Sequence, residues 1–241
     1  MGKRLIHQRR GKGSNRFQAS QNGVVDLHYV PYSPIQREGK VLGQVIDIVD
    51  DPTKTAVLAH IQLEDNRKTY NVAAEGLAVG QTIEMGKTAE VKIGNILPVK
   101  YIPEGAPVFN VEVRPGDGGK LVRGSGVFGL VVTKEANNVL IKLPSTKTIR
   151  VHPDARATIG SVSCGARVEK PFIKAGKKHH AMKARKKRHS IVRGVAMNPN
   201  SHPFGGSQHH PGKSKSTARG APAGRKVGAI ASSRTGRRKK N

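Results

Sequence analysis

The chain of 241 residues is long enough for one large domain or two small ones. It carries 43 Lys and Arg residues against 16 Asp and Glu residues, and at a net charge of +27 a compact free protein would repel itself, so we expect a polyanionic partner. A single cysteine excludes an internal disulfide framework, and the absence of tryptophan with only 4% aromatic residues argues against wide base stacking as the main mode of binding.

The charge is concentrated at the two ends of the chain. Residues 1–40 carry a net charge of +6, residues 41–160 only +1 and residues 161–241 +20, and Glu169 is the last acidic residue. No apolar run is long enough to cross a bilayer and no secretory signal pattern opens the chain. We therefore expect nucleic acid, and not a membrane, as the partner of two basic arms.

The first arm, residues 1–38, has no sustained hydrophobic period. It contains the basic run HQRRGKGSNR at His7–Arg16. Segments of low hydrophobicity and high charge cannot bury enough apolar surface to order by themselves. We therefore predict an irregular basic extension here.

The middle of the chain is typical of β-structure. Short segments rich in Val, Ile, Leu and Thr alternate with Gly, Pro and Asn turns, and no ten-residue helical period interrupts them. The predicted strands are Val41–Val49, Ala56–Leu63, Thr69–Ala73, Gln81–Met85, Val91–Ile96, Val99–Ile102, Val108–Val113, Val127–Thr133, Val139–Leu143 and Thr148–Val151. Because this stretch of about 110 residues exceeds one five- or six-stranded barrel, we predict an all-β fold of two small tandem barrels, residues 39–88 and 89–168.

The second arm, residues 169–241, mixes Lys and Arg with Gly, Ser and Pro. One helix is predicted at Lys178–Ser190, although its like charges would repel each other without a partner. The runs KARKKRH (Lys183–His189) and RTGRRKK (Arg234–Lys240) suit a solvated tail, a localisation signal or phosphate contacts. The density of cations favours phosphate contacts, with arginine forks clamping oxygens and glycines allowing close approach.

A glycine motif and a cysteine are candidates for other chemistry. GSGVFG at Gly124–Gly129 matches the dinucleotide pattern G-x-G-x-x-G, but a strand pattern follows it where a helix is required, which favours glycines at a tight barrel corner. Cys164 could be a nucleophile, although a lone cysteine with small neighbours is expected to be packed and not reactive.

The histidines allow a metal site or a general base. His179–His180, His202 and His209–His210 have no standard ligand spacing and no nearby carboxylate, which favours contacts with phosphate or ribose over a metal. His202 could be the base of an RNA-acting enzyme, but no local acid orients it. A transient nucleic-acid-binding translation or chromatin factor is a further alternative.

The stretch Val192–Gly206, VRGVAMNPNSHPFGG, is irregular and free of acids, and its prolines and glycines restrict and shape the backbone. It closely resembles the signature of the universal large-subunit ribosomal protein two family. Other segments resemble the archaeal type of this family: Met1–Gly13, Gly39–Pro52, Ile149–Gly160, Lys170–His180 and Ala221–Arg237.

The chain departs from the family pattern at three places. Asn200–Ser201 stands where Val and an acid are usual before the histidine, Ser207 interrupts the usual glycine triplet, and Leu143–Lys147 reads LPSTK in place of LPSGE. Phe204 stands where bacterial members tend to have histidine. The missing acid weakens the case for His202 as a tuned base.

The resemblance implies an OB-like barrel followed by an SH3-like barrel, with extensions buried in ribosomal RNA. It implies a non-enzymatic structural protein of the cytoplasmic ribosome that binds 23S-type RNA and supports subunit association, tRNA binding and the peptidyl transferase region. The implied partners are large-subunit RNA, neighbouring ribosomal proteins and the small subunit at an intersubunit bridge, with no membrane. No cofactor is expected, and Mg²⁺ bridging between the tails and phosphates stays open.

The predicted RNA-binding residues all lie in the two arms. They are Arg4, Arg9, Arg10, Lys12, Arg16, Lys177, Lys178, Lys183, Arg185, Lys186, Lys187, Arg188, Arg193, Asn198, His202, Gly205, Gly206, His209, Lys213, Arg219, Arg225, Lys226, Arg234 and Arg237.

Overall fold

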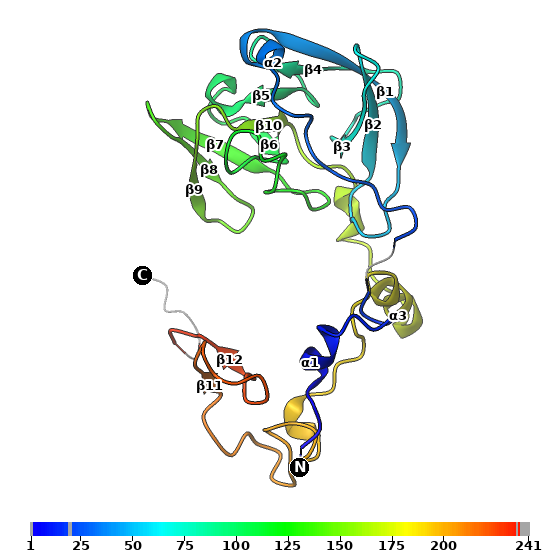
Figure 1. Ribbon diagram of the computed structural model, residues 1–241, viewed down its shortest axis with the longest axis vertical. Coiled ribbons are helices and arrows are strands. Elements are labelled where there is room, and N and C mark those ends of the chain that lie inside the picture. Colours follow the sequence, from blue (N-terminus) through cyan, green and yellow to red (C-terminus); the bar gives the residue numbers. More distant parts are fainter. Residues whose placement is uncertain (1, 19–20, 235, 237–241) are drawn as a thin grey trace. The chain divides into compact units, whose positions relative to one another are not determined.

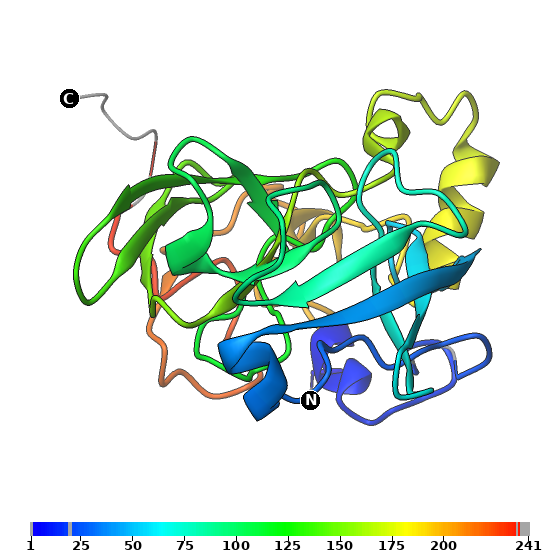
Figure 2. The same ribbon diagram turned by 90° about the horizontal axis from the view of Figure 1, so that it is seen from above.

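The structure is a computed structural model that describes residues 2–18, 21–234 and 236. The chain divides into two units, a β unit spanning Ser20–Phe172 and an arm unit that combines Met1–Ala19 with Ile173–Asn241. The two ends of the chain, far apart in sequence, therefore belong to one unit. Figures 1 and 2 show the elements of each unit from two sides.

The β unit holds one ten-stranded sheet with the order β3-β2-β1-β4-β5-β10-β6-β7-β8-β9. Its strands are β1 (Lys40–Val49), β2 (Leu58–Leu63), β3 (Lys68–Val72), β4 (Thr82–Gly86), β5 (Ile96–Pro98), β6 (Pro107–Phe109), β7 (Gly129–Lys134), β8 (Val139–Lys142), β9 (Thr148–Val151) and β10 (Arg156–Ile159). The remaining helical elements of the unit are α2 (Pro34–Glu38) and two 3₁₀ turns, Val99–Tyr101 and Gly165–Arg167.

The sheet has an N-terminal and a C-terminal half, each with its own core, and a third cluster that includes Leu58, Phe109 and Val162 packs residues of both halves together. In the first half β1 pairs antiparallel with β2 and β4, and Val45, Ile61 and Ile83 point into a common core. In the second half β7, β8 and β9 form an antiparallel meander, with Val131 and Ile141 in the other core. A single parallel register pair, Met85 opposite Ile96, joins β4 to β5 and so connects the halves.

Most predicted strands are confirmed, and three are not. Val91–Ile96 is a turn in which Gly94 has a φ of +94°, and Val99–Ile102 is largely the 3₁₀ turn. The strand predicted at Val108–Val113 ends at Phe109, because Asn110 adopts a left-handed φ of +48°. The structure also contains β10, which the sequence pattern did not reveal.

Residues 21–39 lie in the β unit, not in an extended arm. Leu27, Tyr29, Val30 and Gln36 are buried, the first three at 4%, 5% and 7% exposure. Burial of this apolar surface explains why the segment packs on the sheet although its sequence lacks a period. The predicted arm boundary at residue 38 therefore falls inside the β unit.

The arm unit contains short elements joined by turns. They are α1 (Ile6–Arg10), α3 (Ala175–Ala184), a 3₁₀ turn (Gly194–Ala196) and the parallel pair β11 (Ser216–Thr217) and β12 (Ala229–Ile230). The predicted helix Lys178–Ser190 is wrong at both ends. The helix ends early because Lys186 takes a φ of +53° and Lys187 donates its backbone N–H to Met182 O at 2.9 Å.

Candidate nucleic-acid interface

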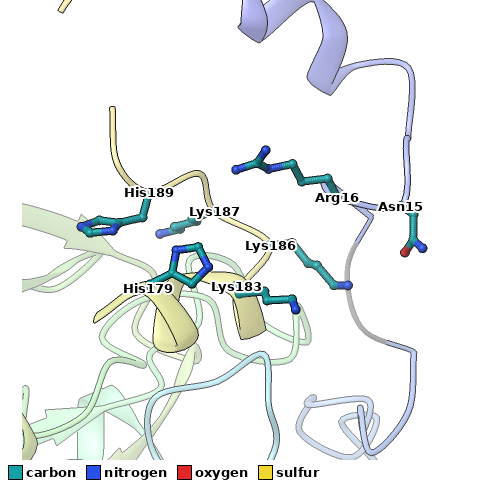
Figure 3. A pocket seen from close by; sticks show the side chains of 7 residues that line it. All are labelled: Asn15, Arg16, His179, Lys183, Lys186, Lys187 and His189. Atoms are coloured by element: carbon teal, nitrogen blue, oxygen red, sulfur yellow. The ribbon is translucent and has the colours of Figure 1, made fainter. Parts of the chain in front are cut away.

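The arm unit holds a cationic hollow of about 520 Å³. Its lining comes from the N-terminal segment (Asn15 and Arg16) and from α3 and the turn after it (His179, Lys183, Lys186, Lys187 and His189), as Figure 3 shows. Four of these seven side chains are permanently charged and none is acidic. The turn that ends α3 places Lys186 and Lys187 on the same hollow as Lys183.

Charge balance makes this hollow a site for an anion. The arm unit has 25 Lys and Arg residues and no Asp or Glu, whereas the β unit has 18 against 16. Among the described residues, no cation of the arm unit forms an ion pair, while half of the 16 acids of the β unit pair with Lys, Arg or His. Cations that have no internal partner need counter-ions, and a polyanion that displaces them gains entropy from their release.

A second feature of the arm unit is the loop Asn198–Gly206, which its own hydrogen bonds shape. Asn198 O accepts the backbone N–H groups of Ser201 at 2.9 Å and of His202 at 3.2 Å, and Met197 O accepts that of Gly206 at 3.0 Å. Gly205 is required because a Cβ there would overlap the carbonyl oxygens of Met197 and Asn198.

His202 lies half-buried in this loop. Its Nδ1 accepts the backbone N–H of Phe204 at 3.0 Å, its ring lies 5.2 Å from the Phe204 ring, and Gly194 leaves the space that the imidazole fills. Burial lowers the pKa of His202, and the charge of His7 lowers it further. A neutral imidazole with an occupied Nδ1 and no carboxylate partner can donate from Nε2, but nothing here tunes it as a base.

The N-terminal segment packs on the same loop. The backbone N–H of Lys3 donates to Asn200 O at 2.6 Å, and Leu5 is buried. A second hollow of about 320 Å³ lies here, lined by residues 2–5, Gln8, residues 199–203 and Gly224. The structure thus brings Arg4 and His202, which are about 200 residues apart in sequence, to one site.

The other predicted residues are distributed over the arm unit. The following are exposed: Arg9, Arg10, Lys12, Lys177, Lys178, Arg193, His209, Lys213, Arg219, Arg225 and Arg234. Arg185, Arg188 and Lys226 are half-buried, and Arg237 lies outside the described residues. Asn15 and His189, which line the cationic hollow, were missed, although both directly flank basic residues.

The backbone conformation also decides the predictions for the GSGVFG motif and for Cys164. A Cβ at Gly126, whose φ is +69°, would overlap Gly165, which confirms the predicted tight corner at this glycine, whereas a Cβ at Gly124 would make only an ordinary contact at 3.8 Å. The expectation that Cys164 is packed is wrong, because it is exposed at a φ of +63°. In the described part of the chain, no three His, Cys, Asp or Glu side chains gather as a metal site would require, and no helix has the length and apolarity to cross a membrane.

A β unit of nearly neutral charge with an acid-free cationic unit is the arrangement of a protein that binds a polyanion. Comparison with protein families identifies the family to which this chain belongs. Residues 3–85 match Ribosomal Proteins L2, RNA binding N-terminal domain, and residues 92–226 match Ribosomal Proteins L2, C-terminal domain. The chain belongs to the ribosomal protein L2 family, whose OB-like and SH3-like domain order confirms the predicted all-β fold class.

The similarity extends over nearly the whole chain. The large ribosomal subunit protein uL2 of Methanothermobacter thermautotrophicus is 47% identical, with 99% of this chain and all of the relative covered. The uL2 proteins of Methanocaldococcus jannaschii and Natronomonas pharaonis are 49% and 48% identical, over 99% and 98% of this chain and 100% and 97% of their own lengths. The predicted archaeal type of the family is confirmed.

Proposed function

We propose that this chain is a structural protein of the large ribosomal subunit that binds its ribosomal RNA. Its relatives are named as large-subunit proteins, and its N-terminal half matches an RNA-binding domain. The observation that carries the proposal is the cationic hollow, where both ends of the chain place cations around one space without a carboxylate. Lysine ammonium groups and an arginine fork in this arrangement suit adjacent backbone phosphates.

The proposal includes finer roles that rest on the family resemblance. They are contacts with neighbouring ribosomal proteins, an intersubunit bridge to the small subunit, and support of tRNA binding and of the peptidyl transferase region in the cytoplasmic ribosome. The loop Asn198–Gly206 supports such a role because it presents His202 Nε2 from a backbone fixed by its own hydrogen bonds. RNA is recognised through such donors at base edges, riboses and phosphates.

Catalysis by the protein is the weaker alternative. A general base near neutral pH is usually an imidazole oriented by a carboxylate, and the residue before His202 is Ser201. The arm unit contains no Asp or Glu at all, so Mg²⁺ at the tails would depend on RNA phosphates for its anionic ligands. We propose a positioning role for His202 and no resident cofactor.

The test is a matched pair of triple variants in the full chain. Lys183→Gln, Lys186→Gln and Lys187→Gln remove three cations of the hollow, and Lys134→Gln, Lys142→Gln and Lys147→Gln remove three exposed cations of the β unit. Affinity for large-subunit RNA is measured between low and moderate salt. Each lost phosphate contact lowers the slope of log affinity against log salt by about 0.7–0.9.

We expect the first variant to lose about 2 to 3 units of slope and the second to lose little. Equal slopes for the two variants would show that total charge, and not the hollow, governs binding. Salt-independent binding by the unmodified chain would contradict the proposed function itself.

A further inference from the structure

We propose that a pocket of the β unit, distinct from the arm unit, binds one unstacked nucleotide of RNA. The pocket has a volume of about 340 Å³, within the range of small-ligand sites, and is lined by Tyr32, Arg37, Pro98, Lys100, Tyr101, Pro115 and Asp154. We call it the tyrosine pocket. The inference rests on the proposed RNA binding and adds a second, chemically different mode of recognition to it.

Cations surround the two aromatic rings of the tyrosine pocket. Arg37 and Arg156 place their guanidinium carbons 5.2 and 4.8 Å from the centre of the Tyr32 ring. Lys87 and Lys100 place Nζ 5.9 and 5.1 Å from the centre of the Tyr101 ring. Such cation–π contacts hold positive charge next to a flat apolar surface, which is the combination that a nucleotide requires.

The charges of the tyrosine pocket are unevenly paired. Lys100 Nζ lies 2.5 Å from Asp154 Oδ1, and buried Arg156 is neutralised by Glu112. Arg37 and Lys87 form no ion pair with any described residue, and their charged ends lie over the Tyr32 and Tyr101 rings. Beside the two rings, the positive charges of Arg37 and Lys87 are therefore available to an anionic ligand.

The combination favours a nucleotide over a peptide. Tyrosine and proline also line grooves for proline-rich peptides, but such a ligand offers no anion to Arg37 and Lys87. A nucleotide supplies a base for the Tyr101 ring, which is 36% exposed, and a phosphate for Arg37 and Lys87. The Lys87 side chain is flexible and can leave the ring for that phosphate.

The pocket is built before any ligand arrives. Arg156 is 3% exposed and donates to Val30 O at 2.7 Å and to Gln36 Oε1 at 3.2 Å, which fixes the segment that carries Tyr32 and Arg37. Tyr101 ends the 3₁₀ turn directly after β5. Rigid support of both rings lowers the entropic cost of binding. Since the described arm residues contain only Phe17 and Phe204 among Phe, Tyr and Trp, the β unit is the part of the chain suited to stacking.

The experiment uses the full chain with Tyr101→Leu, Tyr101→Phe and the control Phe172→Leu, which alters an exposed aromatic outside the pocket. A second test variant, Arg37→Gln with Lys87→Gln, leaves both rings in place. The probes are large-subunit RNA, an unpaired hexamer of 4-thiouridine and 4-thiouridine monophosphate. Affinity is measured by filter binding, and photo-adducts are mapped by mass spectrometry.

We expect adducts of the hexamer on Tyr101 or Tyr32, and a loss of hexamer affinity of about 5- to 100-fold in Tyr101→Leu, with Tyr101→Phe and Phe172→Leu near the parent. The Arg37→Gln, Lys87→Gln chain should lose affinity and adducts together. RNA binding that persists with no adduct in the pocket and no effect of Tyr101→Leu would overturn the tyrosine pocket but leave the proposed function intact.

Two further outcomes would also overturn the proposal that the tyrosine pocket binds a nucleotide of RNA. Equal adduct yield from the monophosphate and the hexamer would assign the pocket to a free nucleotide, and displacement of the hexamer from Tyr101 only by a proline-rich peptide would assign it to a protein partner. Failure of every variant and of the parent to bind large-subunit RNA would refute the proposed function, while adducts of the hexamer at Tyr101 would still support the pocket.

Discussion

At the scale of single residues, His202 shows how a half-buried imidazole can be held without a carboxylate. Its Nδ1 accepts the Phe204 N–H, which requires that this nitrogen is unprotonated. Since the pKa of His202 is lowered in the folded loop, the neutral form is favoured. The stability that this adds to the loop is fully present above the ordinary value of about 6.5 and is lost as the pH falls through the lowered pKa.

The variant His202→Gln therefore distinguishes a positioning role of this residue from a role in proton transfer. Glutamine keeps an acceptor for the Phe204 N–H and a donor, but does not titrate near neutral pH. We expect ribosomes that carry His202→Gln at full occupancy to form peptide bonds at nearly the normal rate in single-turnover assays. A loss of about 100-fold, together with a lost titration near neutral pH, would instead indicate general acid–base catalysis, which is worth roughly 10²–10⁴ in rate.

A substitution at Gly194 tests whether the packing around the His202 ring matters for RNA binding. A Cβ at this position would overlap three atoms of the His202 ring, whereas a Cβ at Gly220 would meet nothing within 4 Å. We expect Gly194→Ala to weaken binding to large-subunit RNA by about 5- to 150-fold, the effect of roughly 1–3 kcal/mol of overpacking. Gly220→Ala should bind like the parent. Equal affinities for both variants in filter binding would mean that the His202 ring moves aside without cost.

At the scale of elements, a buried ion pair attaches the segment Tyr29–Gln36 to the sheet. Glu112 is fully buried and accepts bonds from the Arg156 side chain, with Nη2 at 2.7 Å, and from the Arg156 backbone N–H at 2.8 Å. The same Arg156 reaches Val30 and Gln36. One network therefore connects β10, the turn after β6 and the segment that precedes β1.

Removal of one partner of this pair should be costly. Glu112→Ala leaves the Arg156 charge buried without compensation, and we expect a loss of about 3–5 kcal/mol in the free energy of unfolding. Asp65→Asn, which breaks an exposed ion pair with Arg67, is the control and should leave that free energy unchanged. Urea titration followed by tyrosine fluorescence measures both. Equal midpoints for the two variants would contradict a stabilising role of the network.

Long-range contacts such as those of this network also separate the parts of the fold that the sequence predicts from those that it does not. Strands with a regular supply of β-branched residues, such as Val41–Val49, were predicted because their local pattern suffices. The packing of Leu27 and Tyr29 was not, because long-range partners such as Thr158, whose hydroxyl lies 2.6 Å from the Tyr29 hydroxyl, decide it. Likewise β10 begins with Arg156, a residue that no strand pattern places in a core.

The candidate sites divide in the same way. The cations of the hollow were predicted because basic runs are visible in the sequence. Arg16 and Lys183 were both predicted to bind RNA, but nothing in the sequence indicated that they line the same hollow. The tyrosine pocket was missed entirely. Its residues come from separate segments, and only the fold brings Tyr32 and Tyr101 together.

At the scale of the whole molecule, the chain separates its charge from its apolar cores. The three large hydrophobic clusters all lie in the β unit, and the 25 cations of the arm unit have no acid among them. α3 illustrates the consequence, because it has no buried residue and no acidic residue in its first turn. Such a unit gains little from burial and loses free energy to repulsion unless an anion is bound.

Hydrogen exchange should therefore distinguish the two units. In the free chain we expect strong protection of amides in β1, β2 and β8, and weak protection in residues 175–234, because the repulsion in the arm unit is uncompensated. Large-subunit RNA supplies the compensating phosphates, so the second set should become protected when RNA binds while the first changes little. The measurement is exchange followed by mass spectrometry with and without RNA. Strong protection of α3 in the free chain at low salt would show that the arm unit folds by its own contacts, and RNA would then bind a preformed surface instead of ordering it.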